Sequence, residues 1–529
     1  MAGEWWRGAV IYQIYPRSFR DSNGDGVGDL PGIVAGLDHI ASLGVDGVWL
    51  SPFFPSPMRD FGYDVSDYCG VDPLFGTLDD ARRVIEACHA RGLRVIIDQV
   101  WAHSSDQHPW FAESRATRDG AKADWYVWVD PKPDGTPPNN WLGAFGGPGW
   151  TWDGRRGQYY FHNYLPQQPQ LNVRNPAVQA AILDVARFWL DLGVDGFRLD
   201  VANYFMHDPL LRDNPPRDEP ALPAPFWYQR HIHNKSHPDN LAFLERIRAL
   251  LDCYDERFAV AEILDEDNLA RMAEYTSGRR LHAAYSFHLL RGPCDARFIA
   301  KSVESFFAHP GAPWPCWSFS NHDVIRVVTR WAPKDQTLRP RFAALANALI
   351  TSLPGTSFLY QGEELGLTNV DVPRDRLVDP EAIANWPRHR NRDGARTPMP
   401  WRADAPDLGF GARDPWLPFG PDHAAMAVDL GAADPGSVMN RLRDHLAWRR
   451  SVPGLAGGAA RFFAAPDGLL AFERQATDRR IGFVFNLTEA PRIFCDMAGA
   501  ALIRGDGVLG ADGIRLPPLG HAIVALRGG

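Results

Sequence analysis

The chain has little sulfur chemistry and no long apolar run. Its six cysteines are scattered through 529 residues without a Cys-x-x-Cys pair, a usage that is typical of buried thiols in a reducing compartment. No apolar stretch reaches the roughly 20 residues that a bilayer span requires. The first seven residues, MAGEWWR, lack the basic region and apolar core of a signal peptide. We therefore expect a cytoplasmic protein that has no membrane partner.

An excess of positive charge is also missing. The formal net charge is −9, which is modest for this length and offers no basic face for nucleic acid and no polybasic membrane anchor. Hydrophobic residues make up 45% of the chain, so a large core can form. Because single cores stop growing at about 250–300 residues, we expect one large domain with accessory domains, or two to four domains.

Apolar stretches with β-branched or aromatic residues alternate with helical patterns along most of the chain. The segment 43–50 is nearly repeated at 192–199, and each copy follows a helical pattern, which indicates that the fold reuses one helix-loop-strand unit. Eight strands separated by helices predict an α/β fold, a (β/α)8 TIM barrel. The predicted strands are 10–19, 47–52, 94–103, 196–202, 258–264, 284–289, 316–323 and 357–366.

The spacing of these strands predicts the domain organisation. A barrel of about 250 residues allows about 31 residues for each strand-helix unit. Asp98 and Asp200 are 102 residues apart, so we place an inserted domain at 104–172, after the third strand. The Pro-rich segment 203–239 is a candidate lid. From 453 to 529 the periodicity changes to 2, which predicts a C-terminal antiparallel β-domain, and 1–103 with 173–452 remain for the barrel.

Acidic residues lie toward the ends of four predicted strands, at the end of the barrel where TIM-barrel enzymes carry their chemistry. They are Asp98 with His103, Arg198 with Asp200, Glu262, and Asp323 after Asn321-His322. Buried carboxylates are costly unless they are paired, so such a set indicates function rather than stability. Hydrolysis of a glycosidic bond needs one neutral and one ionised carboxyl group. Because Arg198 lies two residues before Asp200, on the same face of the strand, we expect Asp200 to be the ionised nucleophile.

These motifs resemble the α-amylase superfamily, glycoside hydrolase family 13, over nearly all of the chain. The matching stretches are DQVWAH at 98–103, GFRLD at 196–200, AE at 261–262 and FSNHD at 319–323. Within the superfamily, AVIYQIYPRSFRDSNGDG at 9–26 and RDGARTPM at 392–399 are similar to the α-glucosidase and oligo-1,6-glucosidase branch.

The resemblance implies a retaining exo-α-glucosidase that removes terminal α-linked glucose from short oligosaccharides or α-glucosides through a covalent β-glucosyl-enzyme, with some transglucosylation. It implies a role for each of ten residues. Asp200 is the nucleophile, Glu262 the general acid/base and Asp323 the stabiliser of the transition state; His103, Arg198 and His322 hold the glucosyl ring, Tyr63 stacks on it, Asp64 and Arg392 bind its non-reducing end, and Phe145 is a candidate for the pocket wall.

Two alternatives remain. A sucrose- or trehalose-acting glucosyltransferase or isomerase would use the same chemistry, and product analysis separates it from a hydrolase. A catalytically dead sugar-binding relative would be expected to lack one of the three acids, and all three are present. The preference between α-1,4 and α-1,6 linkages stays open. Val201 favours 1,6 tolerance by resemblance, while the predicted insertion and lid differ from those of oligo-1,6-glucosidases.

The segment 21–29 places oxygen-bearing residues at alternate positions, with glycines between them, like the first half of an EF-hand loop. Gly32 stands where an EF-hand needs a bidentate Glu, so this is not an EF-hand. We expect a compact structural Ca²⁺ or Mg²⁺ loop, as in the resembled branch, and no organic cofactor. Its predicted ligands are Asp21, Asn23, Asp25, Val27 and Asp29.

Overall fold

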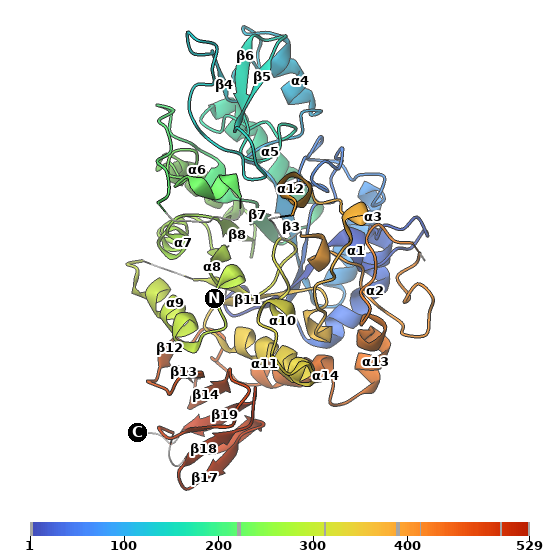
Figure 1. Cartoon of the computed structure of the whole chain (residues 1–529), viewed down its shortest axis with the longest axis vertical. Coiled ribbons are helices and arrows are strands. Elements are labelled where there is room, and N and C mark those ends of the chain that lie inside the picture. The colour runs from blue at the N-terminus through green and yellow to red at the C-terminus, as the bar shows by residue number, and fades with distance from the viewer. Residues whose placement is uncertain are drawn as a thin grey trace.

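Eight parallel strands form the centre of the computed structural model, which describes residues 4–218, 224–311, 314–387, 392–412, 414–497 and 500–526. The strands pair in the order β10-β11-β1-β2-β3-β7-β8-β9. A parallel bridge between Ala284 and Pro315 joins the two edge strands and closes the sheet. This confirms the predicted barrel (Figure 1). The strands are β1 (Val10–Ile14), β2 (Gly47–Leu50), β3 (Arg94–Gln99), β7 (Gly196–Leu199), β8 (Phe258–Ile263), β9 (Ala283–Ser286), β10 (Cys316–Ser318) and β11 (Thr356–Tyr360).

The helices between the strands begin and end at residues that cap them. Before α5, Asn175 accepts a hydrogen bond from the backbone of Ala177, and Gly193 ends the helix in the left-handed region at φ 110°. Thr77 and Asp80 form a capping box at the start of α3. The helices that connect and cover the barrel are α1 (Pro16–Phe19), α2 (Leu30–Leu43), α3 (Leu78–His89), α5 (Pro176–Leu192), α6 (Asn240–Leu251), α7 (Asn268–Thr276), α8 (Phe287–Arg291), α9 (Ala296–Ala308), α10 (Val327–Arg330), α11 (Arg339–Ser352), α12 (Pro380–Asn385), α13 (Val428–Ala433) and α14 (Val438–Arg450).

The long connection from β3 to β7 carries structure of its own, which lies beyond one end of the barrel (Figure 1). It holds α4 (Pro109–Ala116) and an antiparallel sheet in the order β4-β6-β5, made of β4 (Trp128–Val129), β5 (Trp150–Asp153) and β6 (Gln158–Phe161). An antiparallel bridge between His103 and Gln170 ties its two ends together, next to the end of β3. The limits 104–172 for the insertion and 203–239 for the lid remain predictions, and 219–223 lie outside the described residues.

Two antiparallel sheets follow the barrel, as predicted for a C-terminal β-domain (Figure 1). Apolar side chains such as Val484 and Ile514 pack between them. The first sheet has the order β12-β13-β14-β19-β16, with β12 (Ala460–Phe462), β13 (Leu469–Gln475), β14 (Arg480–Asn486), β16 (Ala501–Gly505) and β19 (His521–Leu526). The second has the order β15-β18-β17, with β15 (Arg492–Phe494), β17 (Val508–Gly510) and β18 (Gly513–Leu516).

The burial of the cysteines and the length of the helices test two expectations drawn from the sequence. All six cysteines are free thiols. Cys88 and Cys316 are buried as expected, Cys69 and Cys294 are half-buried, and the expectation is wrong for Cys253 and Cys495, which are exposed. Both lie on the surface, where no packing requires a small apolar side chain. In the part of the chain that the structure describes, no helix is both long enough and apolar enough to cross a bilayer.

The close approach of β7 to β8 gives a test of the barrel. A Cβ atom added at Gly196 would lie 2.0 Å from the backbone oxygen of Phe258, so neighbouring backbone must move to accommodate alanine. We predict that Gly196→Ala lowers the free energy of unfolding by about 3 kcal/mol, which thermal unfolding would detect. Gly457→Ala is the control, because its Cβ meets nothing within 4 Å. Equal melting temperatures for the two variants would contradict the predicted packing.

Candidate active site

A single arginine lies among the polar residues at the ends of β3, β7, β8 and β9. Parallel pairing sets Asp98 on β3 beside Arg198 on β7, and Glu262 on β8 beside Tyr285 on β9. Arg198 has no solvent exposure. Its Nη1 donates hydrogen bonds to Asp98 Oδ1 at 2.7 Å and to Asp200 Oδ1 at 2.6 Å. Its Nη2 forms an ion pair with Glu262 Oε1 at 2.5 Å.

The contact between Arg198 and Asp200 is the one expected from their spacing, but Arg198 is shared more widely than the sequence suggests. Its one guanidinium group forms ion pairs with three carboxylates, those of Asp98, Asp200 and Glu262. The indole face of Trp49, 5.0 Å from the guanidinium carbon, covers the same cation. Because one positive charge cannot neutralise three buried carboxylates, the cluster favours retention of a proton.

The titration of the two central acids follows from this imbalance. Burial raises the pKa of Asp200 to about 7 and that of Glu262 to about 7, while Arg198 acts in the opposite direction on each. Repulsion between the two carboxylates also raises the pKa of Glu262. Such groups titrate as a pair, so near neutral pH they hold one proton between them.

Asp323 is held in the opposite state. Burial alone would raise its pKa, but His322, Arg392 and Arg396 outweigh burial and keep it well below its usual range. Asp323 Oδ1 accepts hydrogen bonds from Arg392 Nη1 at 3.1 Å and from Arg396 Nη2 at 2.8 Å. Asp323 is therefore an anion at all pH values at which the Asp200–Glu262 pair titrates.

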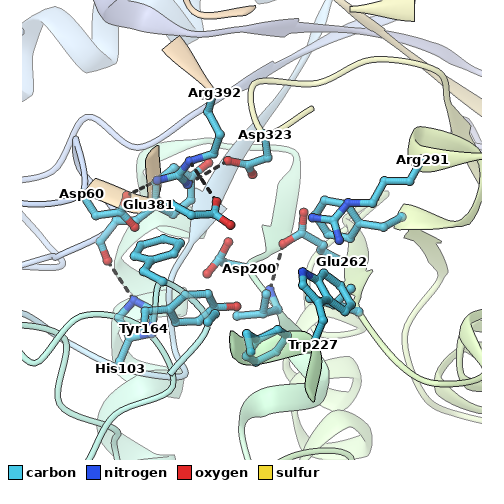
Figure 2. A pocket seen from close by; sticks show the side chains of 17 residues that line it. Asp60, His103, Tyr164, Asp200, Trp227, Glu262, Arg291, Asp323, Glu381 and Arg392 are labelled. Atoms are coloured by element: carbon cyan, nitrogen blue, oxygen red, sulfur yellow. Dashed lines mark hydrogen bonds and ion pairs between the residues drawn. The ribbon is translucent and has the colours of Figure 1, made fainter. Parts of the chain in front are cut away.

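Asp200, Glu262 and Asp323 line one cavity, and Figure 2 shows their carboxyl groups facing the same space. Asp200 follows β7, Glu262 lies at the end of β8 and Asp323 follows β10, so segments far apart in the sequence bring the three acids together. The cavity is the feature that the sequence motifs required. Its other described lining residues are Asp60, Tyr63, His103, Ala144, Phe145, Tyr164, Val201, Phe226, Trp227, Leu264, Phe287, Arg291, Glu381 and Arg392.

Four of the predicted binding residues line this cavity: Tyr63, His103, Phe145 and Arg392. The guanidinium carbon of Arg392 lies 4.7 Å from the ring centre of Phe145, and both residues line the cavity. His103 Nε2 lies 3.0 Å from the backbone oxygen of Tyr63, and burial lowers the pKa of His103 to about 4. His103 is therefore neutral at physiological pH, and its polarity rather than its charge is available to a ligand.

Asp64, which is predicted to bind the non-reducing end of the sugar, does not line the described cavity, whereas Asp60 does. The carboxylate of Asp64 is fully buried and accepts hydrogen bonds from Ser56 Oγ and from the backbone of Arg59 and Asp60, so it stabilises a turn outside the cavity. Asp60 Oδ1 instead accepts a hydrogen bond from Arg392 Nη2 at 2.9 Å. Both acids belong to one short loop, and the sequence does not show which of the two carboxylates accepts the hydrogen bonds of the turn.

Arg198 and His322 also differ from the expectation that they hold the sugar ring. Neither side chain is exposed, and neither lines the described cavity. The ring of His322 stacks on that of Tyr63, with centres 5.3 Å apart, and its Nε2 lies 2.6 Å from the Tyr63 hydroxyl. Gln13 Nε2 lies 2.8 Å from His322 Nδ1 on the other side. Arg198 and His322 therefore position the residues that a ligand would touch.

The chain turns sharply immediately after Asp200. Val201 has φ 34°, in a region that β-branched residues rarely adopt. This conformation points the backbone N–H of Val201 at Glu262 Oε2, 3.3 Å away. The turn therefore links the segment that carries Asp200 to the carboxyl group of Glu262. Strained backbone of this kind is common at functional sites.

Several lining residues were not identified from the sequence. Phe226 and Trp227 lie in the predicted lid segment, in a short 3-10 helix (Pro225–Tyr228), so that segment does reach the cavity. Arg291 ends α8, and Glu381 lies in α12, far along the chain. Figure 2 places Trp227 and Arg291 on the side of Glu262 away from Arg392. No local pattern marks Arg291 or Glu381 as a site residue.

The comparison with protein families decides the family. The family described as "Alpha amylase, catalytic domain" matches residues 13–458. The chain belongs to the alpha-amylase family. A "Probable alpha-glucosidase" of Rhizobium meliloti (strain 1021) is 51% identical over 498 residues, which is 92% of this chain and 90% of that protein. An "Oligo-1,6-glucosidase" of Heyndrickxia coagulans is 35% identical over 525 residues, with 92% of each chain covered. These relatives confirm the predicted branch and a glycoside hydrolase.

Solved structures give the same result for the whole fold. The alpha-glucosyl transfer enzyme XgtA has a TM-score of 0.95 and 49% identity, with 99% of each chain covered. The trehalulose synthase MutB of Pseudomonas mesoacidophila MX-45 has a TM-score of 0.90 and 29% identity, again with 99% of each chain covered. This member of the alpha-amylase family is thus similar in structure to proteins that are named for alpha-glucosyl transfer and for trehalulose synthesis.

The candidate metal loop of this alpha-amylase family member lies between α1 and α2. Asp21 accepts hydrogen bonds from the backbone of Asn23, Gly24 and Gly26, and Asp25 accepts one from Val27. Asp29 caps α2 by accepting from Gly32. Within the described residues no three His, Cys, Asp or Glu side chains are grouped so that they could hold a metal. Metal binding there would also need the Asn23 amide and the Val27 carbonyl, and it stays a prediction.

Asp60 supplies the test of this geometry. Burial raises its pKa to about 6, so its ion pair with Arg392 weakens as the pH falls through 6. We predict that Asp60→Asn raises KM for an aryl α-glucoside about tenfold. The rise stays moderate because Arg392 keeps its hydrogen bonds to Asp323 and Asp379. The rise of the wild-type KM below pH 6 should disappear in this variant. Asp64→Asn should lower the melting temperature and leave the pH dependence of KM intact. If Asp64→Asn abolishes this pH dependence and Asp60→Asn does not, Asp64 rather than Asp60 acts in the site.

Proposed function

We propose that the protein is a retaining exo-acting α-glucosidase, which releases terminal α-linked glucose from short oligosaccharides or α-glucosides. The observation that carries the proposal is that Asp200, Glu262 and Asp323 line one cavity, while one buried arginine contacts both Asp200 and Glu262. Carboxyl groups about 5 Å apart are typical of retaining glycosidases, whereas inverting ones lie about 6.5–9.5 Å apart. Contact with neighbouring nitrogens of one guanidinium group favours the closer arrangement.

Asp200 is the nucleophile in this proposal, and Glu262 carries the shared proton. Arg198 Nη1 donates a hydrogen bond directly to Asp200, while its Nη2 lies in ion-pair range of Glu262 without hydrogen-bond alignment. The guanidinium therefore favours the charged form more strongly for Asp200. Asp200 attacks the anomeric carbon as Glu262 donates its proton to the leaving oxygen. Water, activated by the ionised Glu262, then releases glucose from the glucosyl-enzyme, and the α configuration is retained.

Asp323 and the residues around it account for exo action. Arg392 forms ion pairs with Asp60, Asp323 and Asp379. Figure 2 shows Arg392, Asp60 and Asp323 at one side of the cavity. The polar atoms of this cluster are suited to the hydroxyl groups of a terminal, non-reducing glucosyl unit. Tyr63, whose ring is fixed by stacking on His322, offers an apolar face to the sugar ring. The charge of Asp323 would stabilise the positive charge that develops on that ring in the transition state.

Transfer to an acceptor other than water is the second candidate function, by action on sucrose or trehalose. Solved structures of similar fold are named for alpha-glucosyl transfer and trehalulose synthesis. In this chain Phe226, Trp227 and Phe287 line the cavity together with Arg291. Apolar rings at the leaving-group side would hold an acceptor sugar and reduce the access of water to the intermediate. Chromatography of the products from maltose, isomaltose and sucrose separates the two functions, because glucose dominates only for a hydrolase.

The catalytic roles are tested by replacing each acid. We predict that Glu262→Gln lowers kcat for maltose roughly 10²–10⁴-fold, the usual contribution of a general acid, and that Asp200→Asn lowers it at least as far. Proton NMR of the wild-type reaction should show α-glucose first. Glu364→Gln is a matched control, because Glu364 is buried in the barrel outside the cavity. Full activity in either acid variant, or β-glucose as the first product, would overturn the assignment.

We further propose that the loop of Asp21, Asn23, Asp25, Val27 and Asp29 binds Ca²⁺ or Mg²⁺ as a structural ion. The support is that its carboxylates already order the loop by accepting backbone N–H groups, and a carboxylate oxygen retains a second lone pair for a cation. A ligand at 100 times its Kd stabilises a protein by about 2.7 kcal/mol. After treatment with EDTA, added Ca²⁺ or Mg²⁺ should therefore raise the melting temperature of wild type but not of Asp25→Ala. Equal shifts in both, or none, would contradict metal binding here.

A further inference from the structure

Tyr285 lies behind the proposed acid/base, and no step described above uses it. It belongs to β9, where it pairs in register with Glu262 on β8, so the two side chains project together from adjacent strands. Its side chain is 1% exposed and does not line the described cavity. The ring is held by Trp49, at 6.1 Å between ring centres, and by Phe358, at 5.4 Å in an edge-on contact. Packing therefore fixes where its hydroxyl group lies.

The hydroxyl group of Tyr285 connects Arg198 to Glu262. It accepts a hydrogen bond from Arg198 Nε at 3.0 Å and donates one to Glu262 Oε1 at 2.9 Å. A phenol has one proton to donate. Burial raises the pKa of Tyr285 well above its usual value, so that proton stays on the hydroxyl throughout the working pH range. Glu262 Oε1 consequently faces a permanent donor and also the ion pair with Arg198 Nη2.

The two oxygens of Glu262 are therefore unequal. Oε1 faces Tyr285 and Arg198, while Oε2 meets the backbone N–H of Val201 at the longer distance of 3.3 Å, beside Asp200 (Figure 2). A proton on Oε1 would displace the hydrogen bond from Tyr285 and approach a guanidinium group. A proton on Oε2 faces neither of these obstacles, and Oε2 lies next to the segment that carries the proposed nucleophile.

We propose that Tyr285 is a positioning residue, whose hydroxyl keeps Glu262 Oε1 as a hydrogen-bond acceptor and so directs the acid proton to Oε2, from which it passes to the leaving oxygen. The inference deepens the proposed glycosidase function and rests on it. It also assigns Tyr285 an influence on the titration of Glu262. Burial raises the pKa of Glu262 most, and the hydrogen bond from Tyr285 opposes that rise. Removing the hydroxyl should raise the pKa further.

The test is Tyr285→Phe, assayed with a series of aryl α-glucosides whose phenol leaving groups differ in acidity. We expect kcat/KM to fall roughly tenfold for a poor leaving group, which needs the proton, and to change little for 4-nitrophenol, which does not. The alkaline limb of the pH profile of kcat/KM, where Glu262 loses its proton, should move to higher pH. If the role of Tyr285 were purely structural, Tyr285→Phe would lower kcat/KM for all substrates alike and leave the alkaline limb of the pH profile in place.

Tyr12→Phe is the matched control. Tyr12 is also a fully buried barrel tyrosine that donates its hydroxyl proton to a glutamate, Glu364, at 2.8 Å, but it lies outside the cavity. It should lower the melting temperature without changing the leaving-group dependence or the pH limb. If Tyr285→Phe behaves like Tyr12→Phe, the inference is wrong.

Glu262→Gln and the wild type separate this failure from a failure of the proposed function. An inactive wild type, or a Glu262→Gln variant with full activity on poor leaving groups, overturns the glycosidase assignment itself. A wild type that requires Glu262, combined with an unaltered Tyr285→Phe profile, overturns only the role of Tyr285.

Discussion

The buried guanidinium group of Arg198 is the interaction on which the rest of the site depends. A cation without solvent exposure needs partners that compensate for its lost hydration, and here the carboxylates of Asp98, Asp200 and Glu262 provide them. The same contacts leave the cluster with more negative than positive charge. Glycosidic cleavage needs one ionised and one protonated carboxyl group, and a cluster of this composition supplies both near neutral pH. The contacts that stabilise the buried charge of Arg198 are thus the same contacts that set the protonation states of the acids at the rim of the barrel.

The barrel fixes the positions of the residues around Arg198. Register between β3, β7, β8 and β9 places Asp98, Arg198, Glu262 and Tyr285 beside one another, and the close approach at Gly196 fixes the spacing of β7 and β8. Loops then supply what strands do not. The sharp turn at Val201 directs a backbone N–H at Glu262, and Asp60, from the loop after β2, completes the cluster around Arg392. Strands carry Arg198, Glu262 and Tyr285, while the segments that follow strands supply Asp200 and Asp323 and form the walls of the cavity.

The sequence predicts the eight strands and the three acids of the cavity because both follow local rules: strands are short apolar runs, and the acids lie at or shortly after their ends. It fails where a contact depends on distant segments. Asp64 and Asp60 share one loop, and only the folded turn shows that Asp64 is used for backbone capping while Asp60 contacts Arg392. Arg198 is predicted beside Asp200, but its contacts with Asp98 and Glu262 require the sheet register. Arg291 and Glu381 reach the cavity from elements that carry no local signature.

The central claim, that the buried cluster around Arg198 retains a proton on Glu262 near neutral pH, is measurable by infrared difference spectroscopy. Spectra of the wild type recorded between pH 9 and pH 6 should gain the carbonyl band of a protonated carboxylic acid, with its midpoint near the pKa of about 7. In Glu262→Gln the band should be smaller by the contribution of Glu262, while other buried acids such as Glu363, whose pKa burial raises to about 7, keep theirs. A wild type without the band, or a Glu262→Gln variant that keeps it unchanged, would contradict the account.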